Sequence, residues 1–184
     1  MFRGLRHASV FSVTKRGIFM RFAIGDLIIY GETGVCRVDD IVEKEFLGEV
    51  RPCYKLAPLY QSCMIFTPAD VESVYMRPII TKNEADELID SIANIEPAVC
   101  EVTSPRALSE KYDAIIKQHD CSALISLTKH IYNKRERMIA AKKKLSAVDE
   151  RYLKRAEDLL FSEIAAALSI EKSQTRQYIE EKTR

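Results

Sequence analysis

The hydrophobic period of this 184-residue chain changes close to residue 80, and this change constrains how the chain can fold. Before it, short apolar runs alternate with glycine-containing turns, as in LIIY (27–30) followed by GETG (31–34). After it, apolar residues recur every three or four positions, which is the period of an amphipathic helix. Because strand signals and helix signals occupy separate parts of the chain, we expect an α+β protein.

Five short strands are expected in the first part. They are LIIY (27–30), VCRVDDIVEKEF (35–46), CYKLAPLY (53–60), CMIFTP (63–68) and residues 71–75. Leu47–Glu49 has the composition of a hairpin tip between the second strand and the third. Short strands joined by tight turns are typical of a small barrel. Residues 21–77 are therefore predicted to form an SH3- or Tudor-like β-barrel.

Residues 78–184 are predicted to form a compact all-α domain. Its helix start signals are the capping-box pair Thr81 and Glu84, Ser104 before Pro105, and Ser146. A third helix precedes Ser146 and includes the run KRERMIAAKKK (134–144). A short last helix is expected from about residue 171 to residue 181.

Residues 1–20 have a composition of their own. They carry four basic residues and no acid, so they superficially resemble a transit peptide. The alternative is an extended gene start with Met20 as the natural initiator. We expect a leader of one of these two kinds, with no part in the fold.

Charge is unevenly distributed between the two predicted domains. Residues 21–104 hold 7 basic and 15 acidic residues, whereas residues 105–184 hold 17 basic and 12 acidic residues. An acidic part and a basic part suggest two different partners, and the second partner would be a polyanion.

The sequence contains no constellation typical of an enzyme. His119, Cys121 and His130 lack the paired spacing of zinc ligands, and a Cys–His nucleophile is a remote alternative. No GxxxxGK[ST] phosphate loop is present. We therefore expect no catalysis, no cofactor and no metal.

Cysteine usage and hydropathy bear on the compartment. The five cysteines are widely spaced and form no CxxC pair, which favours reduced thiols in a cytoplasm. No apolar run reaches the roughly 20 residues that span a bilayer, so no membrane insertion is expected.

Two stretches are candidates for binding. The run 134–144 carries six basic residues and one acid, so it is either a solvated helix face or a contact for nucleic-acid phosphates. In CMIFTP, the consecutive Met64, Ile65 and Phe66 cannot all point into one barrel core. The exposed ones are either covered by the helical domain or belong to a strand edge that pairs with a partner's sheet.

The order of these pieces resembles the CarD/CdnL family of bacterial transcription regulators, from about Phe22 to Leu168. The first module of that family is shared with the transcription–repair coupling factor. The resemblance rests on FAIGDLIIYGETGVCRVDDI (22–41), KEFLGE (44–49), Tyr54, IFTPAD (65–70), VYMRPI (74–79), SEKYDAII (109–116) and LSAVDERYLKRAEDLLFSEIAAAL (145–168).

The resemblance implies a function and a set of site residues. The Tudor-like module of such proteins docks on the β subunit of RNA polymerase by strand addition. Their helical domain contacts promoter DNA near the upstream edge of the melted region, and together the two domains stabilise the open complex. The implied polymerase contacts are Lys44, Met64, Ile65 and Phe66. The implied DNA contacts are Arg106, Leu108, Lys111, Lys142, Lys143 and Lys144. A monomer that binds DNA weakly and without sequence preference is expected.

Three positions depart from the family pattern. Leu108 stands where many members carry a tryptophan wedge, and it shares a helical face with Tyr112, so a core role is the alternative. Glu110 replaces one of two expected basic residues, and Phe66 stands where relatives often have arginine. Polymerase docking therefore carries over better than DNA contact. The rival function is a protein–protein adaptor that does not engage DNA.

Overall fold

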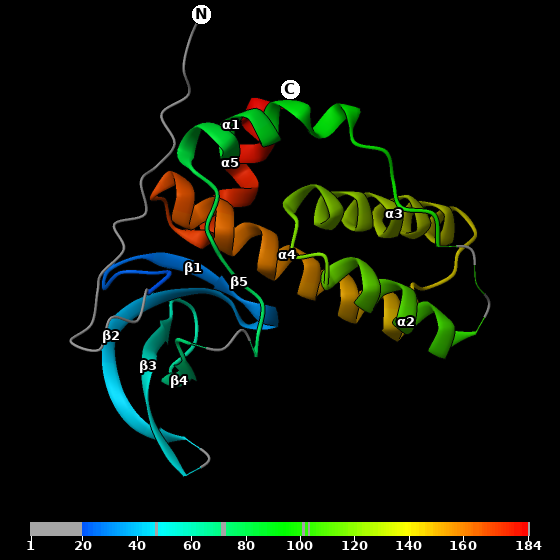
Figure 1. Ribbon diagram of the computed structural model, residues 1–184. Coiled ribbons are helices and arrows are strands. Elements are labelled where there is room, and N and C mark those ends of the chain that lie inside the picture. Colours follow the sequence, from blue (N-terminus) through cyan, green and yellow to red (C-terminus); the bar gives the residue numbers. More distant parts are fainter. Residues whose placement is uncertain (1–19, 47, 71–72, 101, 103, 184) are drawn as a thin grey trace, which may run out of the picture. The chain divides into compact units, whose positions relative to one another are not determined.

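The computed structural model describes residues 20–46, 48–70, 73–100, 102 and 104–183 (Figure 1). They fall into two compact units. The first contains residues up to Tyr30 together with Val35–Pro78, and the second contains Gly31–Gly34 together with the residues from Ile79 onward. The predicted leader, residues 1–20, lies outside the described residues except for Met20.

The described part of the first unit is built on a five-stranded antiparallel sheet. In chain order its strands are β1 (Leu27–Tyr30), β2 (Gly34–Phe46), β3 (Glu49–Pro58), β4 (Ile65–Pro68) and β5 (Met76–Pro78). Their order in the sheet is β4-β3-β2-β1-β5. Among the described residues no strand pairing joins β4 to β5, so the sheet is open and the closure expected of a barrel is not seen.

Strand β2 is long, and Figure 1 shows that it curves strongly. Its register with β3 shifts at Asp39, because Val38 lies opposite Leu56 and Asp40 lies opposite Lys55. One unpaired residue of this kind is a β-bulge, which bends a strand and increases its twist. The bend allows one strand to follow the curvature of the sheet along its whole length.

The fifth strand lies later in the chain than predicted. Val71 and Glu72 are outside the described residues, and Ser73–Tyr75 do not belong to a strand. Instead Met76 pairs with Tyr30 and contributes its side chain to the core, whereas Tyr75 is exposed. The apolar character of Val74 and Tyr75 suggested a strand, but only tertiary packing decides which residue enters the core.

The other strands lie close to their predicted positions, with differences at their ends. Strand β3 begins at Glu49 rather than at residue 53, because the hairpin with β2 extends to the pair Phe46 and Glu49. Strand β4 begins at Ile65, so Cys63 and Met64 precede it. The predicted hairpin tip includes Leu47, which is outside the described residues.

The core of the first unit is organised around Tyr54. This side chain is fully buried, its ring lies 5.8 Å from the ring of Phe22, and its hydroxyl oxygen accepts a hydrogen bond from the Phe22 amide at 3.0 Å. Burial raises the pKa of the Tyr54 hydroxyl, which keeps it neutral. These two contacts hold Phe22, near the start of the described residues, against β3.

In its described residues, the second unit contains five α-helices. They are α1 (Lys82–Ser91), α2 (Pro105–Ile116), α3 (Cys121–Ala140), α4 (Ala147–Leu168) and α5 (Thr175–Lys182), with 3-10 turns at Gly31–Thr33, Ile92–Asn94 and Lys172–Gln174. Helices α3 and α4 run side by side, α2 packs against both, and α1 packs against α4 and α5 (Figure 1). The predicted mixed fold, strands first and helices after, is confirmed.

Two of the predicted helix caps are confirmed. Thr81 and Glu84 form both hydrogen bonds of a capping box, and the Ser146 hydroxyl accepts from the Asp149 amide at 3.2 Å. Ser104 occupies the N-cap position of α2 but forms no side-chain capping bond. Helix α3 is capped by Asp120, whose carboxylate accepts from the Ala123 amide at 2.9 Å.

A buried carboxylate joins three elements of the second unit. Asp149 is fully buried, and it accepts hydrogen bonds from the Tyr112 hydroxyl at 2.8 Å, the Lys134 ammonium at 2.9 Å and the Ser146 hydroxyl at 2.6 Å. Burial alone raises the pKa of Asp149, but these three donors outweigh it and hold the pKa below its usual value. The carboxylate is therefore charged in the folded protein.

The stability of the protein should consequently fall on acidification. A carboxyl group with a depressed folded pKa contributes its full stability above its unfolded pKa of about 3.9 and loses it as the pH falls through the folded pKa. Urea unfolding between pH 7 and pH 3 should show a shallower pH dependence in Asp149→Asn than in the wild type. Asp90→Asn, at an exposed position of α1, is the control and should follow the wild type. An Asp149→Asn profile parallel to the wild type would contradict the assignment.

Candidate protein-docking edge and nucleic-acid surface

Strand β4 forms one edge of the sheet. It pairs with β3 through Ile65 opposite Leu56, Phe66 opposite Lys55 and Thr67 opposite Tyr54, and no described strand pairs with its other side. An edge strand presents backbone N–H and C=O groups to which another chain can add a strand. Pro68 has no N–H group, so the edge available for pairing ends at Thr67.

The three apolar residues around the start of β4 point in different directions. Ile65 packs against the core of the first unit, and Thr67 is buried on the same side of the strand. Phe66 lies on the opposite side and is 36% exposed, and Met64, which precedes the strand, is 44% exposed. The edge therefore carries two large apolar side chains that contribute little to the core.

The structure brings Lys44 and Phe66 together. The Lys44 ammonium nitrogen lies 3.3 Å from the centroid of the Phe66 ring, although the two residues belong to strands separated by β3. A cation over an aromatic face is attracted by the ring quadrupole. Two of the predicted polymerase contacts thus form one exposed cation–aromatic pair.

Two further cations lie on the same face of the sheet. Lys55 is opposite Phe66, and Arg51 is opposite Lys44. The Arg51 guanidinium forms an ion pair with Glu49 and lies 3.9 Å from Asp70. Lys44 therefore provides the positive charge over the Phe66 ring, and Lys55 lies opposite Phe66 on β3.

Sequence reasoning missed two exposed apolar residues near this edge. Leu59 and Tyr60 were assigned to the third strand, but β3 ends at Pro58, and both side chains are exposed in the connection to β4. A proline within the run CYKLAPLY was the available signal, because proline often ends a strand.

The three predicted DNA contacts on α2 differ in their exposure to solvent. Arg106 and Lys111 are exposed, and the Arg106 side chain forms an ion pair with Glu110 at 3.0 Å. Leu108 is only 6% exposed and lies in the same core cluster as Tyr112. Its burial corresponds to the core alternative that the sequence left open.

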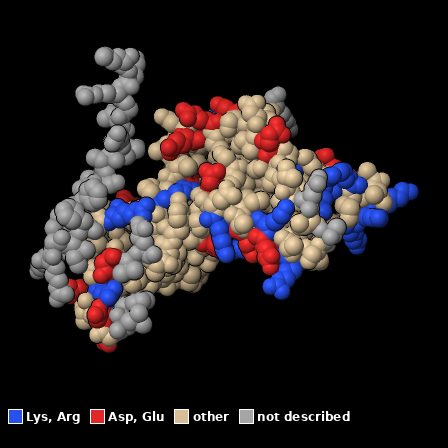
Figure 2. All heavy atoms as spheres, turned by 45° about the vertical axis from the view of Figure 1, so that its right-hand side comes forward, with Lys and Arg blue, Asp and Glu red and all other residues tan. Residues whose placement is uncertain are grey.

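The basic run spans the end of α3 and the residues after it. Lys134 is directed to Asp149, whereas Arg135 and Arg137 are exposed. The helix ends at Ala140, and Lys142, Lys143 and Lys144 follow it as exposed residues. Figure 2 shows Lys and Arg side chains gathered over this end of the helical unit. Cations at a helix C-terminus also interact favourably with the helix dipole.

Of the residues considered for a metal or nucleophile site, Cys121 has a structural partner. The Cys121 thiol is buried and donates to the Glu163 carboxylate at 3.2 Å. Burial raises the pKa of Cys36 to about 12, which keeps that thiol neutral and unreactive. Within the described residues no group of three or more His, Cys, Asp or Glu side chains is arranged to hold a metal ion. Over the same residues no helix is long and apolar enough to cross a membrane.

The first part of the chain matches a family of known domains. Residues 22–80 match the family model of the CarD-like/TRCF RID domain, and this range contains all five strands of the sheet. A search of curated proteins finds no match. Domains of this family interact with the β subunit of RNA polymerase. The resemblance seen in the sequence is confirmed for this part of the chain: residues 22–80 belong to the CarD-like/TRCF RID domain family.

Proposed function

We propose that this protein is a non-enzymatic transcription regulator with two binding surfaces. Its sheet docks on the β subunit of RNA polymerase, and its helical unit contacts promoter DNA and stabilises the open complex. The observation that carries the proposal is the family match of residues 22–80 to a polymerase-interacting domain. The open edge of β4, with an exposed apolar pair beside it, supports docking by strand addition.

In the docking step, a strand of the polymerase adds to β4 at Ile65–Thr67. The backbone of these residues supplies the hydrogen bonds, and the side chains of Met64 and Phe66 supply contact area. Lys44 stands over the Phe66 ring and adds positive charge at a place where relatives often carry arginine. Aromatic residues and arginine are enriched among the interface residues that contribute most of the binding energy. The pair of Phe66 and Lys44 combines an aromatic ring with a cation in a similar way.

In the DNA-contacting step, the exposed basic residues at the end of α3 neutralise backbone phosphates. Such contacts are independent of sequence and weaken as salt is added, because binding releases condensed counterions. Arg106 and Lys111 on α2 would extend this surface. Two observations favour the rival adaptor function: Leu108 is buried, and Arg106 is already paired with Glu110. The DNA surface therefore rests on the basic residues rather than on a wedge.

Phe66→Glu should reduce affinity for the isolated β-subunit lobe by about tenfold or more, because it removes an exposed interface anchor and places a carboxylate beside Lys44. Isothermal titration calorimetry on the full chain measures the effect. The control is Val50→Glu, which introduces the same charge at another exposed apolar position, on the opposite face of β3 from Lys55. Equal affinity of Phe66→Glu and the wild type would remove the docking proposal.

Replacing Lys143 and Lys144 by alanine should weaken binding to a short promoter duplex. It should also make the slope of log K against log salt shallower by about 2, because each lysine that neutralises a phosphate accounts for a slope of roughly one. Fluorescence anisotropy at several salt concentrations gives both quantities. The matched control replaces Lys117 and Lys154, two exposed lysines outside the basic run. No measurable binding of the wild type at low salt would support the adaptor function instead.

Leu108→Ala should lower the free energy of unfolding by about 2–5 kcal/mol, because it leaves a cavity in the helical core. Its affinity for DNA should stay close to that of the wild type at a temperature at which both proteins are folded. Urea unfolding and the same anisotropy assay test the two expectations. A reduced DNA affinity with unchanged stability would assign Leu108 to the DNA contact.

A further inference from the structure

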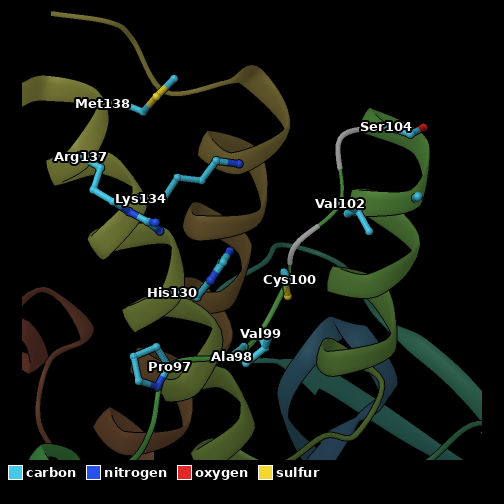
Figure 3. Close-up of a pocket in the computed structure, with 11 residues that line it drawn as sticks. Pro97, Ala98, Val99, Cys100, Val102, Ser104, His130, Lys134, Arg137 and Met138 are labelled. Atoms are coloured by element: carbon cyan, nitrogen blue, oxygen red, sulfur yellow. The ribbon is translucent and has the colours of Figure 1, made fainter. Parts of the chain in front are cut away.

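The second unit contains an open groove of about 1010 Å³, and the function proposed above assigns no ligand to it (Figure 3). One wall is the connection before α2, including Pro97 and Val102, together with Ala107 of α2. The opposite wall is the C-terminal half of α3. The volume is at the upper end of the range of sites that bind small molecules.

The described residues of the connecting segment make one side of the groove mainly apolar. Pro97, Ala98, Val99 and Val102 line it, and Met138 adds an apolar side chain from α3. Cys100 is buried at the groove, and burial raises the pKa of its thiol, so it is a neutral and weakly polar group. A ligand would therefore contact a mainly hydrocarbon surface on this side.

The α3 wall carries nitrogen-bearing side chains. His130, Lys134 and Arg137 are spaced four and three residues apart, which places them on one face of the helix, and Figure 3 shows them along that wall. None of the described residues that line the groove is acidic. Among the described lining residues, those of the connecting segment are thus mainly apolar and those of α3 are mainly nitrogen-bearing.

The three nitrogen-bearing side chains are not equivalent. Lys134 forms an ion pair with the buried Asp149 at 2.8 Å, so its charge is already balanced. Arg137 donates from Nε to the Asn133 carbonyl at 3.3 Å, and no ion pair between Arg137 and a carboxylate of the described residues is found. One guanidinium charge therefore remains for a ligand.

His130 supplies a second polar group. Its Nε2 atom is buried and has no hydrogen-bond partner among the described residues. Burial, and then the neighbouring charge of Lys134, lower the pKa of His130, so the ring is neutral near pH 7 in the free protein. An anion beside the ring favours its protonated form, in which both nitrogens donate. Because buried polar atoms in proteins usually have a partner, the Nε2 position points to a ligand atom.

We propose that the groove binds a small amphipathic monocarboxylate. The carboxylate forms a bidentate pair with the Arg137 guanidinium. One of its oxygens also accepts a hydrogen bond from His130 Nε2–H. The apolar body of the ligand covers Pro97, Val102 and Met138. A single negative charge fits, because Arg137 is the one side chain among the described lining residues that brings an unbalanced positive charge in the free protein. A DNA backbone phosphate has no apolar body that could cover this apolar wall.

Calorimetric titration of the full chain with sodium decanoate, below its critical micelle concentration, tests the proposal. We expect one site per chain and at least roughly tenfold weaker binding of decanol, which has the same chain without the charge. Arg137→Gln should weaken decanoate binding by about tenfold or more. The control Arg135→Gln, an exposed arginine of α3 outside the groove, should bind as the wild type does.

Two further measurements locate the ligand. The ¹⁵N resonance of His130 Nε2 should shift on addition of decanoate, and Ala107→Phe, which fills the groove and leaves its charges in place, should abolish binding. Circular dichroism verifies that both groove variants remain folded.

Three results would overturn the proposal. They are equal binding of decanoate and decanol, an equal effect of Arg135→Gln and Arg137→Gln, and unaltered decanoate affinity in Ala107→Phe. Displacement of a short DNA duplex by inorganic phosphate, with no binding of decanoate, would instead assign Arg137 to the DNA surface.

Discussion

The helical unit depends on the charge of Asp149, a carboxylate with no access to solvent. A buried carboxylate without partners would be very costly, and here α2, α3 and the start of α4 each provide one donor. The same arrangement determines which basic residues remain for ligands. Because Lys134 is committed to Asp149, the neighbouring cations at the end of α3 are the ones that remain available to an external anion.

Much of the fold could be predicted from local sequence. The helix starts at Thr81 and Ser146 follow from side chains that satisfy nearby amides, and the strand LIIY follows from its apolar run between two turns. The fifth strand was misplaced because its position depends on which residue meets β1 across the sheet, and Met76 does so rather than Tyr75. Whether β4 and β5 approach each other is likewise a property of the whole sheet, which no local pattern contains.

The candidate sites were predictable as residues but not as arrangements. Lys44 and Phe66 could be named from the family resemblance, yet their contact across β3 needs the sheet register. The helical spacing of Leu108 and Tyr112 was compatible with a core position, but only the packing of α2 places Leu108 in it. The groove beside α3 was missed entirely. His130 carries no signal in the sequence, because the position of its Nε2 atom becomes visible only when the segment before α2 is placed against the helix.

The bulge at Asp39 determines which side chains of β2 lie on the outer face of the sheet. Before it, Val38 points to the inner face opposite Leu56, and strict alternation would put residue 44 on that inner face as well. The one additional residue reverses the alternation, so that Ile41 lies opposite the buried Tyr54 and Lys44 shares the outer face with Phe66. Deleting Asp39 would keep this pairing and these faces but would remove the bulge that bends the strand. A deletion or insertion of one residue in the regular part of β2 would instead exchange the two faces beyond it. In this module, insertions and deletions in β2 are therefore more damaging than most substitutions, and the spacing of the strand is itself part of the docking surface.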